Sequence, residues 1–223
     1  MATAGIVEYE SGRGAFRLPA EHAAMVTRAA GPNNFACFAQ LIPLCAGVED
    51  ELVDKFRHGG GVPYSSYPRF HETMAEMSGA IFDAGLVETT LPLVPGLIAK
   101  LDGSVKFDFM TTFDAVHDQA DPQGMVDGIY RSLKPDSYWL CVDVQGSSYV
   151  GENLNHPMGT FIYSVSCQHC MTVSLAYDGV GLGAMWGVQK AREIFGNAGF
   201  DKIDIQSLPA DPLNNYYICH RPA

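Results

Sequence analysis

The spacing of apolar residues divides the chain into a helical part and a part in which strands alternate with helices. In the first part, apolar side chains recur every three or four residues, as at Phe70, Met74 and Met77, which is the period of a helix with one buried face. Near the start, the turn "SGRG" lies between two short apolar segments and predicts a β hairpin. The pattern therefore predicts an α-rich domain with a short β hairpin over 1–101, followed by an α/β domain over 102–223.

The second part contains four strand-like segments: "VKFDFMTTFDAV", "SYWLCVDVQ", "DKIDIQSLP" and "NNYYICHRP". Two segments with helical periodicity, "PQGMVDGIYRSLKP" and "WGVQKAREIFGNAGF", lie among them. Strands that alternate with helices favour a sheet with parallel strands. The last two strands are only a few residues apart, which favours an antiparallel pair at the end of the sheet.

Composition and charge narrow the classes of partner and compartment. The chain has 223 residues and a net charge of −11, with no cluster of Lys and Arg, so it should repel nucleic acid and anionic membranes. No apolar run approaches the ~18–20 residues that cross a bilayer, and the start lacks the features of a secretory signal. We therefore expect a cytoplasmic protein whose six cysteines are free thiols.

Several long blocks of the sequence resemble one enzyme family. "GLVETTLPLVPGLI", "FDAVHDQADP", "SLKPDSYWLCVDV", "LNHPMGTFIYSVSCQHCMTVSL" and "DPLNNYYICHRP" are similar to the class I methyltransferases that place a winged-helix domain before a Rossmann-like domain. The resemblance runs from about Tyr9 to Pro222. It implies S-adenosylmethionine as the cofactor, a small molecule as the methyl acceptor, and neither nucleic acid nor membrane as a partner.

Compared with that family, this chain lacks two parts. The family's helix-turn-helix would precede the hairpin, and its first three sheet strands, with the glycine loop, would precede "FDFMTTFDAVHD"; the second gap is roughly 70–90 residues. The remaining strands would form a partial Rossmann-like sheet in the order 4-5-7-6. We therefore expect S-adenosylmethionine to bind weakly or not at all. The alternative is a non-catalytic splice form or an interaction protein, which could form a homodimer through the exposed edge strand.

The glycine-rich stretch "SLAYDGVGLG" raises the question of a nucleotide loop. The methyltransferase signature places one residue between the acidic residue and the first glycine, whereas Asp178 directly adjoins Gly179. The stretch also follows the region that resembles the family's fifth strand rather than its first. We therefore interpret Gly179, Gly181 and Gly183 as a turn that only looks like a cofactor loop.

The segment "AVHDQ" carries the residues that we expect to be catalytic. His117 and Asp118 lie at the carboxyl end of a sheet strand, which is where open α/β sheets bind ligands. A histidine can act as a general base near neutral pH, and Asp118 could orient it. Gln119 is then a candidate for the substrate pocket. The alternative is a polar loop that caps the helix that follows.

The resemblance adds candidates for contact with the cofactor and the substrate. Phe113 and Asp114, at the end of the same strand, are expected near the cofactor, together with Tyr64 from the loop "HGGGVPYSSYP". In the family this loop closes over the site of methyl transfer, so His71 is a candidate for the substrate pocket. The alternative for the loop is a flexible connection between helices.

The block "LNHPMGTFIYSVSCQHC" offers further candidates. In the family it lines the substrate side of the site, which suggests His156, Cys167 and His169 as pocket residues and implies no metal. Cys167 and Cys170 form a C-x-x-C pair that could bind zinc with a nearby histidine, but structural zinc sites normally have a second such pair. Plain packing in the core is the third interpretation.

Overall fold

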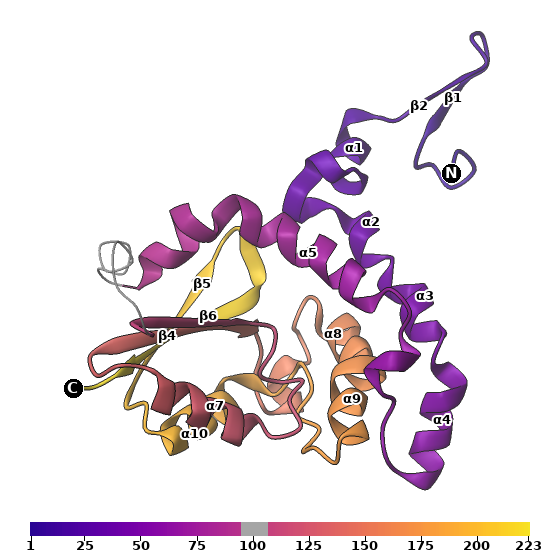
Figure 1. Ribbon diagram of the computed structural model, residues 1–223. Coiled ribbons are helices and arrows are strands. Elements are labelled where there is room, and N and C mark those ends of the chain that lie inside the picture. Colours follow the sequence, from indigo (N-terminus) through magenta and orange to yellow (C-terminus); the bar gives the residue numbers. More distant parts are fainter. Residues whose placement is uncertain (95–106) are drawn as a thin grey trace. The chain divides into compact units, whose positions relative to one another are not determined.

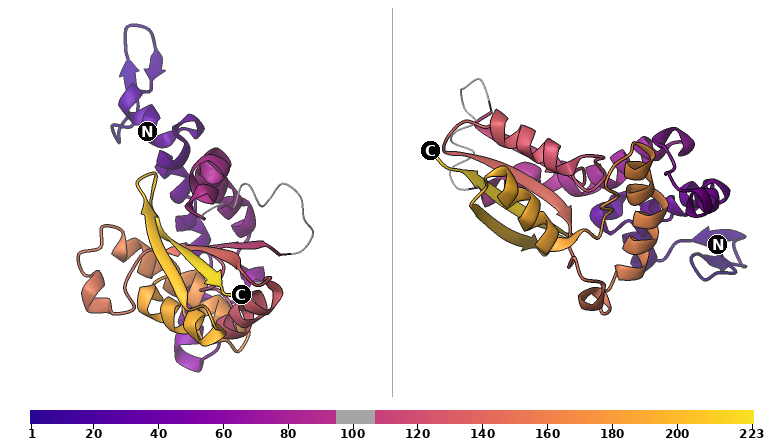
Figure 2. Two further views of the ribbon diagram at one scale, coloured as in Figure 1. Left: turned by 90° about the vertical axis from the view of Figure 1, so that its left-hand side faces the viewer. Right: turned by 90° about the horizontal axis from the view of Figure 1, so that it is seen from below.

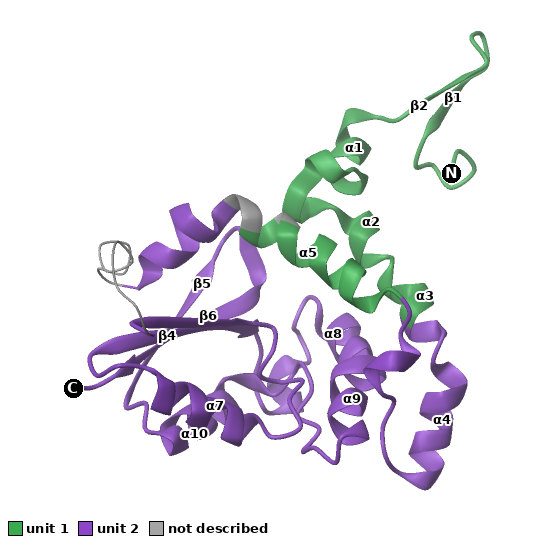
Figure 3. Cartoon of the chain, viewed as in Figure 1, with its two compact units in different colours: residues 1–44, 69–84 green, residues 45–68, 85–223 purple. Residues whose placement is uncertain are grey.

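The computed structural model of the chain describes residues 1–94 and 107–223 (Figure 1). The predicted domain boundary between residues 101 and 102 lies outside the described residues and stays a prediction. Among the described residues, no helix combines the length and the apolar character needed to cross a membrane. The chain forms two compact units, shown in Figure 3, that comprise residues 1–44 with 69–84, and residues 45–68 with 85–223.

The first unit contains the predicted β hairpin and short helices. Strands β1 (Glu8–Glu10) and β2 (Ala15–Arg17) pair antiparallel, with Tyr9 opposite Phe16, which confirms the hairpin. Pro19 then precedes helix α1, a position where its fixed φ suits the start of a helix. The helical segments that follow are α1 (Ala20–Val26), η1 (Arg28–Asn33), α2 (Phe35–Phe38), α3 (Leu41–Ala46), which extends into the second unit, and α5 (Phe70–Gly85).

The second unit holds the sheet and the helices around it. Its helical segments are α4 (Glu49–His58), η2 (Tyr64–Ser66), η3 (Leu86–Thr90), η4 (Leu91–Leu93), α7 (Pro122–Ser132), η5 (Val150–Asn153), α8 (Gly159–Val165), η6 (Ser166–Cys170), α9 (Met171–Ala176) and α10 (Gly187–Ala198). Its strands are β3 (Phe109–Phe113), β4 (Ser137–Val144), β5 (Lys202–Leu208) and β6 (Asp211–Arg221).

The four strands form one mixed sheet in the order β3-β4-β6-β5. β3 and β4 are parallel, whereas β6 is antiparallel to both of its neighbours. This arrangement confirms the predicted α/β layer with an antiparallel pair at its end. Within the part of the chain that the structure describes, β3 pairs with β4 alone and is an edge strand.

The main core lies between the sheet and helices α7 and α10, which cover the same face (Figure 2). Trp139 and Cys141 of β4 and Tyr217 of β6 are fully buried on that face, where Phe195 of α10 packs edge-on against Trp139. Side chains alternate along a strand, so Leu140 and Val142 point to the opposite face, and these residues are fully buried too. Burial on both faces explains why the "YWLCV" run of β4 is apolar without interruption.

Candidate functional site

A short loop at the carboxyl end of β3 carries the predicted catalytic residues. The strand ends at Phe113, and Asp114 takes a left-handed conformation with φ of 43°, which turns the chain away from the strand. Helix α7 then begins, capped by Asp121, whose carboxylate accepts a hydrogen bond from the Gly124 N–H at 2.8 Å. Because Asp121 caps the helix, His117 is left for another role, and its side chain points into the protein with 3% exposure.

His117 is held by a carboxylate from the neighbouring strand. Its Nδ1 lies 2.6 Å from Oδ1 of Asp143, which is fully buried near the end of β4. The same oxygen accepts hydrogen bonds from the indole N–H of Trp186 at 3.1 Å and from the N–H of Val144 at 2.8 Å. A carboxylate can only accept, so Nδ1 carries the proton that it donates, and Nε2 is the atom that can bind or accept a further proton.

The Nε2 side of His117 meets polar groups from three segments. Asp118 Oδ1 lies 3.2 Å from Nε2, and the Tyr64 hydroxyl donates to Asp118 Oδ2 at 3.2 Å. The thiol of Cys170, which ends η6 and is 6% exposed, also forms a hydrogen bond with His117. The structure therefore brings together His117, Asp118 and Tyr64, three of the residues predicted from the sequence, and adds Cys170 to them.

Burial and crowded acidic groups shift the protonation of these residues. Burial disfavours the charged imidazole of His117, but Asp143 together with Cys170 outweighs it and raises the pKa of His117 well above its usual value. Burial and the nearby Asp143 raise the pKa of Asp114 to about 7. Burial and Asp118 raise the pKa of Tyr64, and likewise raise the pKa of the Cys170 thiol to about 11. The site therefore favours the imidazolium form of His117 beside Asp143. On the Nε2 side of that ring it favours the neutral Cys170 thiol and the neutral Tyr64 phenol.

Other predicted residues take different positions. The Gln119 side chain donates to the Ala115 carbonyl at 2.9 Å and so braces the His117 loop. His156 Nδ1 accepts from the Met158 N–H at 3.2 Å in the turn before α8. His71 is exposed on α5 in the first unit, where its ring lies edge-on to Phe70.

The C-x-x-C segment is helical, because both cysteines lie in η6. Cys167 is partly exposed, whereas Cys170 is buried toward His117. His169 is 1% exposed, with its ring 5.3 Å from the Tyr64 ring and 4.9 Å from the Tyr67 ring. This packing resembles a core contact more than an open pocket wall.

Asp143 is the residue that reasoning from the sequence missed. The segment "SYWLCVDVQ" places one carboxylate near the end of an otherwise apolar strand. A charge in such a strand is costly unless it is paired, and this was the available signal for a buried partner. The pairing itself depends on where β3 lies beside β4, since residues 117 and 143 are 26 positions apart.

The glycine-rich turn lies between α9 and α10, so it does not follow a sheet strand. A Cβ built on Gly179 would lie 2.4 Å from Cα of Ala120, and one on Gly183 would lie 2.3 Å from Oγ of Ser166. The Val180 N–H also donates to the Ala120 carbonyl at 3.1 Å. The space beside these two glycines is thus filled by the protein itself, and the turn supports the loop that carries His117.

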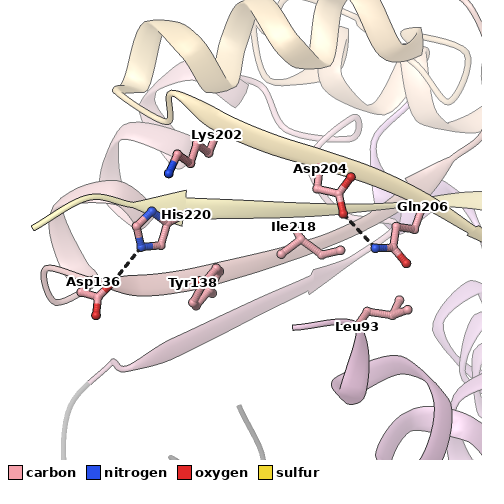
Figure 4. A pocket seen from close by; sticks show the side chains of 8 residues that line it. All are labelled: Leu93, Asp136, Tyr138, Lys202, Asp204, Gln206, Ile218 and His220. Atoms are coloured by element: carbon pink, nitrogen blue, oxygen red, sulfur yellow. Dashed lines mark hydrogen bonds and ion pairs between the residues drawn. The ribbon is translucent and has the colours of Figure 1, made fainter. Parts of the chain in front are cut away.

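A separate hollow of about 360 Å³ lies on the sheet face opposite α7 and α10 (Figure 4). Two interactions join residues that line it: His220 Nε2 lies 3.0 Å from Asp136 Oδ1, and the Gln206 amide donates to Asp204 at 2.8 Å along β5. None of the sequence-predicted site residues lines it. Its lining residues are Leu93, Asp136, Tyr138, Lys202, Asp204, Gln206, Ile218 and His220.

Comparison with known proteins gives the fold. No family model and no curated protein matches the sequence. Among solved structures, PigF with SAH has a TM-score of 0.62 at 15% identity and covers 98% of this chain and 82% of its own. Human N-acetylserotonin methyltransferase in complex with SAM has a TM-score of 0.63 at 13% identity and covers 100% and 81%. The mitomycin 7-O-methyltransferase MmcR has a TM-score of 0.61 at 15% identity and covers 98% and 80%. The chain therefore has the fold of the class I S-adenosylmethionine-dependent methyltransferases.

Proposed function

We propose that this chain is a small-molecule methyltransferase by ancestry that keeps the proton-accepting centre and has an impaired hold on S-adenosylmethionine. The observation that carries the proposal is the buried His117–Asp143 pair at the carboxyl ends of two parallel strands, with Nδ1 and Oδ1 2.6 Å apart. In open α/β sheets this end of the strands is where ligands bind. The solved structures with SAH and with SAM support the cofactor class.

The residues of this chain can handle a proton from the substrate. Asp143 fixes the orientation of His117 and stabilises its imidazolium, so His117 must first release the proton on Nε2 before that atom can accept one from the substrate. Asp118 and Tyr64 lie on the Nε2 side and can position a hydroxyl group of the acceptor. S-adenosylmethionine, when bound to such a fold, supplies the methyl group. Phe113, Asp114 and Tyr64 remain the candidates for contact with it.

The glycines of the described residues support the proposal of a weak hold on the nucleotide part of the cofactor. In the family that the sequence resembles, a glycine loop after the first strand lets backbone N–H groups approach the ligand. Here the loops that directly follow β3 (114–121) and β4 (145–149) contain a single glycine, Gly146, and a Cβ on it would lie 2.9 Å from Met185 Cε. Gly179 and Gly183 are occupied by protein atoms in the same way.

The strand order supports the same proposal. If β3, β4, β6 and β5 correspond to the family's strands 4, 5, 7 and 6, the strands that hold adenosine in the family are not among those that the described residues form. The hairpin of β1 and β2 would then be the wing of a shortened winged-helix domain. Both assignments belong to the proposal.

Titration calorimetry of the full chain with S-adenosylmethionine tests the hold on the cofactor. We expect no saturable heat, or a dissociation constant weaker than about 0.1 mM, equivalent to roughly 5.5 kcal/mol of binding free energy. S-adenosylhomocysteine serves as a second ligand that shares the adenosine and needs the same loop. A low-micromolar constant for either ligand would show that the proposal is wrong.

One observation favours a second candidate function, that of a non-catalytic protein that pairs with a second copy. Within the described residues, β3 presents one edge without a partner strand, and its residues Phe109 to Phe113 carry no charge that would discourage pairing. Sedimentation equilibrium distinguishes the candidates. A dimer in the micromolar range supports pairing, and a monomer at all concentrations rejects it.

A further inference from the structure

Three potential metal ligands of different chemistry converge beside the His117 loop. His117 and Asp118 come from the connection after β3, and Cys170 comes from the end of η6. One ligand atom from each residue lies within 4.8 Å of the other two. Cys170 and His117 are buried, and Asp118 is partly buried with 14% of its side chain exposed. A nitrogen, a sulfur and an oxygen donor thus face one small volume.

The environment of the histidine suits coordination through Nε2. Nδ1 is bonded to Asp143 at 2.6 Å, and metal-binding histidines almost always donate their other N–H to a carboxylate or carbonyl in this way. That bond fixes the ring and leaves Nε2 toward Asp118 at 3.2 Å. The arrangement therefore already contains the outer carboxylate that a metal-bound imidazole needs.

The carboxylate of Asp118 supplies a second, independent indication. Its Oδ2 accepts a hydrogen bond from Tyr64, whereas its Oδ1 is shielded from solvent, makes no hydrogen bond of good geometry among the described residues and lies 3.2 Å from His117 Nε2. A cation bound between this oxygen and Nε2 would satisfy both buried atoms. This oxygen is the one that lies beside His117 Nε2.

We propose that His117, Asp118 and Cys170 bind a divalent transition-metal ion of the zinc class, with the fourth position open to water. Three protein ligands and one open position are typical of catalytic zinc sites rather than structural ones. In a tetrahedral site, bond lengths of about 2.0–2.3 Å place the ligand atoms roughly 3.5 Å apart, so side-chain movements of about 1 Å would close the site. Binding releases two protons to solvent, one from the Cys170 thiol and one from Nε2 of the His117 imidazolium.

This ligand set differs from both expectations drawn from the sequence. The family resemblance implied no metal, and the C-x-x-C alternative paired Cys170 with Cys167. Within the described residues, Cys167 does not belong to a group of metal ligands, although it lies three residues from Cys170. The metal proposal does not rest on the proposed methyltransferase function. If both hold, the ion and the substrate proton compete for the same Nε2 atom, and the metal inhibits proton acceptance.

Cobalt(II) is the probe that tests the site, because it replaces zinc and reports its ligands by absorption. We expect one cobalt ion per chain, with a thiolate-to-cobalt charge-transfer band in the near ultraviolet and the visible bands of a tetrahedral site. The Cys170→Ser variant should lose the charge-transfer band. The Cys167→Ser variant is the matched control, since it alters a thiol in the same helical segment, and it should keep the band.

Asp118→Asn provides a second variant that keeps the shape of the side chain. Equilibrium dialysis with zinc should show at least a tenfold weaker affinity for this variant, with the circular dichroism spectrum and melting temperature used to show that it folds. Absence of the charge-transfer band in the native chain, or its loss in Cys167→Ser with retention in Cys170→Ser, would overturn the proposal. Calorimetry with S-adenosylmethionine is a separate measurement, so failure of one proposal leaves the other intact.

Discussion

Two aspartate–histidine pairs lie at opposite ends of strand β4, and they differ in almost every physical respect. At the amino end, Asp136 contacts His220 at 3.0 Å, with 71% of the Asp136 side chain and 18% of the His220 side chain exposed. At the carboxyl end, Asp143 contacts His117 at 2.6 Å, with 0% and 4% of the two side chains exposed. The same two residue types therefore form a solvated surface pair at one end and a buried centre at the other.

The difference shows that what an aspartate–histidine pair can do in this fold depends on its burial more than on the two residue types. Water screens the charges of the pair at the amino end, and the exposed Asp136 carboxylate can form hydrogen bonds with water if its partner is removed. The buried pair has lost its water, and two further N–H groups are directed at the same Asp143 oxygen. Removal of one buried partner should therefore have a much larger effect than the same change at the surface.

Matched substitutions test this comparison most strongly. Asp143→Asn should lower the free energy of unfolding by about 3 kcal/mol, because it leaves a buried imidazole without its carboxylate. Asp136→Asn should change it by about 0–1 kcal/mol, and asparagine tolerates the left-handed conformation that Asp136 adopts at φ of 57°. Urea unfolding followed by circular dichroism measures both values. Equal effects would mean that burial does not distinguish the two pairs.

The glycine-rich turn sharpens the comparison because it supports only the buried pair. Gly179→Ala should cost about 2–3 kcal/mol, since the added Cβ would meet Ala120 and the backbone of Ser174. Gly196→Ala is the control, because a Cβ there meets nothing within 4 Å on helix α10, and it should be neutral or slightly stabilising. Thermal unfolding by calorimetry compares the two variants. A neutral Gly179→Ala would contradict the tight packing of the turn.

Asp114 gives the smallest expected effect, and that effect depends on pH. Burial raises its pKa to about 7 in the folded chain, so the folded state binds more protons than the unfolded state between about pH 4 and pH 7. Stability from this residue is therefore present at low pH and is lost as the pH rises through that window. At a pH above this window, Asp114→Asn should therefore raise the free energy of unfolding by about 1–2 kcal/mol. This value allows for solvent screening, because Asp114 is partly exposed.

Unfolding free energies of Asp114→Asn and the native chain at about pH 4 and at pH 8 measure the difference. Asparagine tolerates the left-handed backbone at this position, and about pH 4 is the lower end of the window, so the two proteins should differ little there. The variant should be the more stable of the two at pH 8. A constant difference at both pH values would show that the Asp114 carboxyl group does not titrate in this range.

Much of the fold followed from local pattern. The turn "SGRG" predicts the hairpin, strand-like apolar segments predict β3 to β6, with β4 an uninterrupted apolar run, and helical periodicity predicts α7 and α10. The buried His117 was predicted as a site residue because it follows a strand. Phe113 and Asp114 stay predictions as contacts of the cofactor and Gln119 as a pocket residue; the structure shows that the Gln119 side chain braces its own loop.

The candidate site was less predictable than the fold. The C-x-x-C spacing drew attention to Cys167 and Cys170 as a pair, but a helical segment holds them and only Cys170 turns toward His117. His169 was expected in a pocket and is packed between two tyrosine rings. Motif spacing could not reveal these directions, because they depend on which face of η6 is buried.

The sequence by itself determined the type and order of the elements, the mixed sheet and the place of the His117 loop at the end of a strand, because hydrophobic spacing acts over a few neighbouring residues. Tertiary structure alone decided that Asp143 faces His117 and that Cys170 joins them. Those contacts depend on the register of β3 against β4, with Phe113 beside Val142, and on the packing of η6 against the sheet end. Register and packing are set by the whole core, and a single local pattern does not contain them.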